Sequence, residues 1–110
     1  MGITKSDKFT DEQNHLAKLA KAFGHPARIA ILEYLFKQEQ CICGDLVNEI
    51  GLAQATISQH LKELKKLGVI KGSISGTSVC YCIDLENWKS FKQTFNVFLN
   101  QDNNFKGSCC

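Results

Sequence analysis

The fold of this chain is decided by residues 44–68, which read GDLVNEIGLAQATISQHLKELKKLG. Apolar residues near the start of this stretch, Leu46, Val47 and Ile50, recur at the spacing of one short amphipathic helix. Gly51 ends that helix, because glycine tolerates the left-handed conformation that a sharp turn between two helices requires. The stretch therefore predicts two helices that meet at a tight turn.

The second of these helices is predicted from Gln54 to Leu67 and has two unlike faces. One face is apolar at helical spacing and is expected to pack on the core; it consists of Ile57, Leu61, Leu64 and Leu67. On the other face, glutamine can pair with adenine, serine and threonine can serve several bases, and lysine can reach phosphate. The predicted DNA-binding residues are Gln54, Thr56, Ser58, Gln59, His60, Lys62 and Lys65. A polar face alone is just as typical of a solvated helix, so the order of elements has to decide.

A β-hairpin is predicted directly after this helix. Apolar residues alternate with a period of two in residues 69–74 and 78–83, on either side of the turn-rich residues 75–77. Two helices joined through a glycine turn and followed by a hairpin are the order of a winged helix-turn-helix. Lys71 is the one cation near the uncharged tip of this wing, so we expect a weak phosphate contact there.

Further helices complete a mainly α-helical fold, with about five helices and a two-stranded wing. Two helices are predicted before residue 40, divided at Pro26, and a last helix is predicted from about Glu86 to Asn100. One face of the last helix is rich in large apolar residues, namely Trp88, Phe91, Phe95, Phe98 and Leu99. That is more aromatic surface than so small a core needs, which favours a subunit interface; packing within one subunit is the alternative.

Length and composition leave room for one domain with one core. The 110 residues are 44% hydrophobic and carry a formal net charge of +2, so total charge alone does not indicate nucleic-acid binding. No apolar stretch approaches the roughly 18 residues of a membrane span, and the polar N-terminus lacks a secretory signal. We therefore expect a cytoplasmic protein without membrane contact.

These motifs resemble the ArsR/SmtB family of metal- and thiol-responsive repressors. The sequence GHPARIAIL at 24–32 is similar to the family's second-helix signature, and 44–46, 58–62 and 67–70 follow at the family's spacing. The resemblance covers residues 13–100. It implies a repressor rather than an enzyme, a homodimer joined through its first and last helices, and double-stranded palindromic operator DNA as the partner. It implies no cofactor for DNA binding.

The predicted organisation follows from this resemblance and from composition. Residues 1–12 form a polar N-terminal segment, and residues 13–100 form the winged helix-turn-helix domain with dimerisation helices at both ends. Residues 101–110 form a polar tail that contains cysteines and is expected to be mobile.

Six cysteines fall into three pairs, and two pairs are predicted metal ligands. Cys41 and Cys43 precede a helix N-terminus, which favours thiolate, the form that binds soft metals or attacks oxidants. They resemble the Cys-x-Cys segment of arsenic- and cadmium-sensing relatives, although Gly44 adds one residue to the usual arsenic-sensor spacing. Cys109 and Cys110 are expected to supply the missing thiolates, with trivalent arsenic or antimony, or another thiophilic metal, as inducer.

The third pair, Cys80 and Cys82, alternates with apolar residues in a strand, so both are expected on one face as small packed residues, with an extra thiol site as the alternative. A zinc site on the last helix is disfavoured, because that region offers Glu86 and Asp102 but no histidine. Two other functions stay open, namely a repressor that senses oxidants or persulfide and a winged-helix module that does not bind DNA. Catalysis is disfavoured, because no Cys-x-x-Cys lies in a βαβ pattern.

Overall fold

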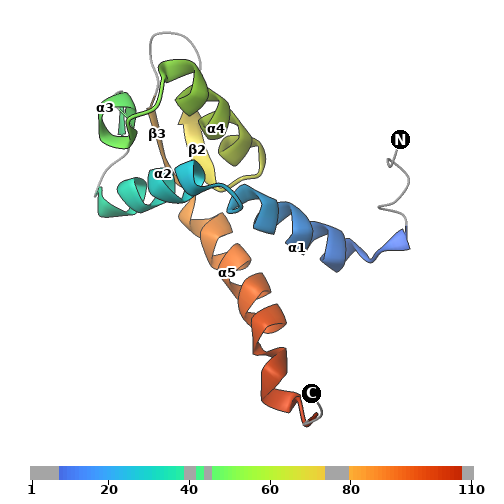
Figure 1. The fold of residues 1–110 in the computed structure, drawn as a ribbon. Helices are drawn as coiled ribbons and strands as arrows, with labels where there is room; N and C mark the ends of the chain where they lie inside the picture. The colour runs from blue at the N-terminus through green and yellow to red at the C-terminus, as the bar shows by residue number, and fades with distance from the viewer. Residues whose placement is uncertain (1–7, 39–41, 44–45, 74–79, 108–110) are drawn as a thin grey trace.

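A computed structural model describes residues 8–38, 42–43, 46–73 and 80–107 (Figure 1). The helices are α1 (Asp11–Ala22), α2 (Pro26–Lys37), α3 (Leu46–Ile50), α4 (Gln54–Lys66), α5 (Leu85–Leu99) and the short 3-10 helix η2 (Asn100–Asn104). The strands are β1 (Ile42–Cys43), β2 (Ile70–Ser73) and β3 (Cys80–Ile83). The predicted mainly helical fold with a β-hairpin wing is confirmed.

Capping side chains set where α1 and α2 begin. The Thr10 hydroxyl accepts from the Gln13 backbone N–H at 3.0 Å, and the Gln13 side chain accepts from the Thr10 N–H at 2.9 Å. This reciprocal pair starts α1 at Asp11. At α2, His25 Nδ1 accepts from the Ala27 N–H at 3.1 Å, and Pro26 occupies the first turn.

The sheet has three strands, one more than the sequence predicted. Its order is β1-β3-β2, and both pairings are antiparallel. Strand β1 pairs Ile42 with Tyr81 and Cys43 with Cys80. Because β1 has only two residues, it is too short for an alternating pattern to reveal it, and the sequence predicted this segment only as an extended link.

The core lies where α1, α2, α4 and α5 meet the inner face of the sheet. Its buried members are Leu19, Ala22, Ile31, Leu32, Leu35, Leu46, Ile57, Leu61, Leu64, Val69, Ile70, Tyr81, Ile83 and Phe91. Gly51 and Gly68 have φ values of 81° and 83°, so the turns before and after α4 use the left-handed conformation that glycine permits. The predicted turn at Gly51 is confirmed, and it sets the angle at which α4 leaves α3.

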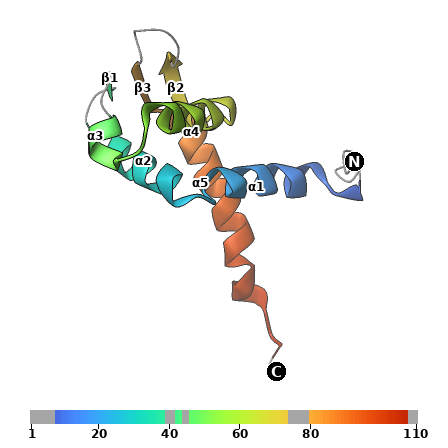
Figure 2. The same ribbon diagram turned by 45° about the horizontal axis from the view of Figure 1, so that its top comes forward.

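The chain is more extended than a compact domain of its size. Its radius of gyration is 16.8 Å, whereas about 13 Å is usual for 100 residues. Figures 1 and 2 show the reason, because α1 and the C-terminal half of α5 project away from the helix-turn-helix and the sheet. The tail begins as η2 rather than as irregular chain. No helix in the described part of the chain is long and apolar enough to cross a bilayer.

Candidate nucleic-acid interface

Helix α4 is fixed to the domain by a fully buried stripe. Ile57, Leu61 and Leu64 are 2%, 1% and 0% exposed, because they recur at three- and four-residue spacing on the inner side. This packing turns the opposite face to solvent. Of the residues predicted to bind DNA, those that the structure leaves exposed are Gln54, Thr56, Gln59, Lys62 and Lys65, and Ser58 is half-buried.

The first turn of α4 presents both side chains and backbone. Ala53, at the N-cap, makes no side-chain capping hydrogen bond, so the first N–H groups of the helix are not capped by that side chain. Such N–H groups at the positive end of a helix dipole suit a phosphate oxygen. One turn on, Gln54 Nε2 donates to Ser58 Oγ at 3.1 Å. This bond orients the Gln54 amide before any ligand arrives.

Positive charge gathers at the other end of α4 and continues onto the wing. Lys62, Lys65 and Lys66 are exposed in the last two turns of the helix, and Lys71 is exposed on β2. No acidic residue lies in the first turn of α4. The helix therefore offers uncharged polar side chains at its start and cations towards its end, which suits base edges and phosphates respectively.

The structure differs from the sequence prediction at His60, which is 8% exposed and does not face solvent. Its Nδ1 accepts from Arg28 Nε at 3.2 Å, and its ring lies 4.5 Å from that of His25. The reason is its place beside the buried stripe, three residues after Ile57 and four before Leu64. His60 joins α4 to the start of α2 instead of contacting DNA.

Burial lowers the pKa of His60 below its ordinary value of about 6.5, and the positive charges of His25 and Arg28 lower it further. The neutral ring is the form that can accept the Arg28 hydrogen bond. The sequence prediction missed this positioning role of His25 and Arg28. The N-cap position of His25, directly before Pro26, was the one signal available for it.

The cysteines are only partly described. Cys43 lies on β1 opposite Cys80, while Cys41, Cys109 and Cys110 lie outside the described residues. Cys80 and Cys82 are half-buried on β3 and both are disulfide-bonded, so they are not simply packed apolar residues as predicted. Among the described side chains, no group of three or more His, Cys, Asp or Glu could hold a metal ion.

Comparison with known proteins assigns the chain to a family. Residues 25–71 match the model of the bacterial regulatory protein, arsR family. The cadmium resistance transcriptional regulatory protein CadC homolog of Staphylococcus aureus is 34% identical over 102 residues, which span 90% of this chain and 82% of that protein.

The chain belongs to the arsR family.

Other relatives agree with this assignment. An uncharacterized HTH-type transcriptional regulator of Methanocaldococcus jannaschii is 41% identical over 68 residues, 61% of this chain and 75% of that protein. The crystal structure of an ArsR family transcriptional regulator has the same fold, with a TM-score of 0.69 at 18% identity over 87% of this chain and 94% of that one. The arsR-family chain is therefore a DNA-binding transcriptional regulator, and the resemblance stated from its motifs is confirmed.

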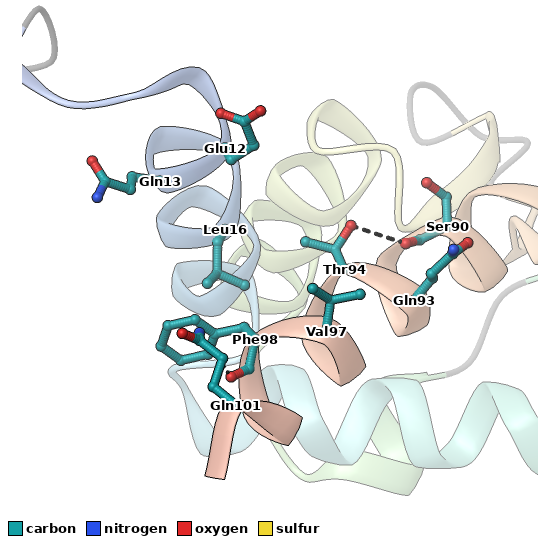
Figure 3. Close-up of a pocket in the computed structure, with 9 residues that line it drawn as sticks. All are labelled: Glu12, Gln13, Leu16, Ser90, Gln93, Thr94, Val97, Phe98 and Gln101. Carbon is teal, nitrogen blue, oxygen red and sulfur yellow. Dashed lines mark hydrogen bonds between the residues drawn. The ribbon is translucent and has the colours of Figure 1, made fainter. Parts of the chain in front are cut away.

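A second surface of this arsR-family chain lies away from α4. Helices α1 and α5 border an open groove of about 450 Å³ with a mainly apolar surface, into which Leu16 and Phe98 project (Figure 3). The groove is lined by Glu12, Gln13, Leu16, Ser90, Gln93, Thr94, Val97, Phe98 and Gln101. Val97 and Phe98 are 68% and 51% exposed.

The aromatic face of α5 is thus divided. Phe91 is buried, and Trp88 meets Phe23 and Phe36 edge-on, with ring centroids 5.7 and 4.8 Å apart. These N-terminal aromatic residues pack within the subunit. Beyond them, Phe98 and Leu99 are more than half exposed.

Proposed function

We propose that this chain represses transcription as a homodimer on operator DNA, and that a thiophilic ligand bound by cysteine thiolates releases it. The exposed polar face of α4 carries this proposal, because a buried stripe holds that face outward on a helix-turn-helix. The family assignment supplies DNA binding and regulation. The dimer, the residues that contact DNA and the inducer are the parts that we add.

In this proposal α4 lies in the major groove. Gln54, Thr56, Ser58 and Gln59 reach base edges from its first half, where the side chains are short and uncharged. Lys62 and Lys65 contact phosphate from its second half. His60 is left out of the contact surface, because it is buried against Arg28.

The groove between α1 and α5 supports the dimer. An apolar surface with large exposed side chains at its centre is costly to leave in water, and a second copy of the same helices would cover it. The extended shape of the single chain agrees with this arrangement. A two-fold dimer would present two α4 helices to two half-sites of a palindrome.

The inducer that we propose is trivalent arsenic or antimony, bound first by Cys41 and Cys43. Soft thiolate ligands select such ions, and the tail cysteines Cys109 and Cys110 are one source of a third thiolate. The name of the S. aureus relative, a cadmium resistance regulator, supports a thiophilic inducer. A redox-sensing repressor is the second candidate, favoured by the disulfide-bonded state of Cys80 and Cys82.

One titration tests the proposal. The reduced protein is bound to labelled DNA from upstream of its own coding region, and arsenite, antimonite, cadmium, zinc or polysulfide is added. We expect arsenite and antimonite to release the wild-type protein, and Cys43→Ser and Cys41→Ser to prevent release. Release by polysulfide alone would favour the redox repressor. Release by none of these would refute the sensor role and leave DNA binding intact, and no complex at all would indicate a module that does not bind DNA.

A further inference from the structure

The sheet joins cysteines that are far apart in the sequence. Cys43 on β1 is the direct cross-strand partner of Cys80 on β3, and Cys82 follows two residues later on the same strand. β3 is the central strand, with β1 on one side and β2 on the other (Figure 2). The linker before the helix-turn-helix is therefore hydrogen-bonded to the wing at a position occupied by cysteine on both strands.

These positions share the outer face of the sheet. Along β3, Tyr81 and Ile83 are 1% and 8% exposed and belong to the core, whereas Cys80 and Cys82 alternate with them and are half-buried. Residues directly opposite in an antiparallel pair lie on one face. Position 43 therefore belongs to the face of Cys80 and Cys82, away from the core, where an ion from solution has access.

The backbone spacing suits sulfur–sulfur contact. Directly opposite residues have Cα atoms about 4.5–5.5 Å apart, within the range of about 4.4–6.8 Å that a disulfide spans. Cys80 and Cys82 are in fact both disulfide-bonded in the structure. Once reduced, such sulfur atoms stay close enough to share one ion. Lys71 on β2 stands opposite Cys82, so a cation accompanies the thiolate charge that must form there.

We propose that Cys43, Cys80 and Cys82, once reduced, bind one thiophilic ion as three thiolates across β1 and β3. This inference rests on the proposed function in one respect only, because it names the site of the inducer. It places the third thiolate on the wing rather than in the tail. With arsenous acid as the probe, each thiol proton leaves with one hydroxyl group as water. Three As–S bonds replace three As–O bonds, and no atom changes oxidation state.

An ion at this site would act on both parts of the DNA-binding unit. β1 ends two residues before α3, and β3 is a strand of the wing whose other strand follows α4. Three bonds to one centre would fix the start of the helix-turn-helix to the wing, and so change how α4 and the wing meet DNA together. The ion would thereby have different affinities for the free and DNA-bound arrangements, as an inducer must.

Native mass spectrometry of the full reduced chain with arsenite tests the site without DNA. We expect one arsenic per chain, with the loss of three protons. Cys43→Ser, Cys80→Ser and Cys82→Ser should each weaken arsenite binding by about tenfold or more, because three thiolates bind this ion far better than two. The matched control is the double variant Cys109→Ser/Cys110→Ser, which should bind arsenite like the wild type. Circular dichroism checks that each variant is folded.

Two results would overturn the site. One is a folded Cys80→Ser and a folded Cys82→Ser that both bind arsenite as tightly as the wild type. The other is loss of binding in the tail double variant, which would assign the third thiolate to the tail. Operator release is measured in parallel on the same samples. Arsenite bound at the site without release would refute the proposed inducer role and leave the site standing.

Discussion

Helices α4 and α5 are of similar length, 13 and 15 residues, and each carries an apolar stripe along one side. The stripe of α4 is buried by its own chain, from Ile57 to Leu64. The stripe of α5 is buried only at Phe91 and half-buried at Trp88 and Phe95, and it ends at Phe98 and Leu99, which are 51% and 64% exposed. The difference separates two kinds of binding. α4 is held rigidly so that its polar face can meet another kind of molecule, whereas α5 has an apolar end that a second copy would cover.

The largest effect is expected where the α4 stripe is removed. Leu64→Ala should lower the free energy of unfolding by about 2–5 kcal/mol, because it opens a cavity at a site that is 0% exposed. Urea unfolding followed by circular dichroism measures this. Thr56→Ala, on the exposed face of the same helix, is the control and should change stability by less than about 0.5 kcal/mol. Equal effects of the two substitutions would show that α4 is not anchored by its stripe.

A second prediction concerns the exposed end of α5. Phe98→Asp should weaken dimerisation by at least about tenfold, because it puts a charge at the centre of an interface that is otherwise apolar. Sedimentation velocity over a range of concentrations would follow the monomer fraction. Asn96→Asp adds the same charge on α5 outside the groove and should leave the dimer intact. If the wild type is itself monomeric at high concentration, the groove is not the dimer interface.

A smaller effect is expected at the polar face of α4. Lys62→Ala should reduce the slope of log K against log salt by about 0.9, because one phosphate contact is lost. Its affinity should fall by a similar factor on every DNA sequence, since phosphates carry no sequence information directly. Fluorescence anisotropy at several salt concentrations gives the slope. Lys92→Ala on α5 should leave the slope unchanged, and a drop there instead would move the DNA surface away from α4.

The smallest effect concerns His60, on the inner side of α4. Because its pKa is lowered in the folded chain, the unfolded chain takes up this proton first as the pH falls below about 6.5. Stability from this group is therefore complete above that pH and declines below it. Thermal unfolding between pH 7.5 and about pH 5 should show the decline. In His60→Gln it should be shallower, and an identical pH profile would show that His60 is not the group responsible.

The fold could be predicted from sequence because its signals are local. Gly51 between two short amphipathic segments, and the change from a helical to an alternating period after Gly68, required no knowledge of distant residues. The face of α4 followed from the same periodicity. The bounds of α1 were less certain, because they depend on the capping pair of Thr10 and Gln13.

Long-range pairs explain what the sequence could not predict. His60 looks like one more polar residue on α4 until Arg28 and His25, more than thirty residues earlier, are placed beside it. Likewise, Cys43 and Cys80 become neighbours only through the pairing of β1 with β3. A two-residue strand has no periodicity of its own, and no local pattern could have joined the linker cysteines to the wing.

The polar face of α4 is tested most directly by equilibrium binding to DNA. Anisotropy would compare the wild type, Gln59→Ala and the control Glu86→Ala on a labelled duplex from upstream of the chain's own coding region. The account predicts two chains per duplex, a loss of about 1–3 kcal/mol of binding free energy for Gln59→Ala, and no change for Glu86→Ala. A wild type that binds no better than to a shuffled duplex, or a Gln59→Ala that binds as tightly as the wild type, would contradict it.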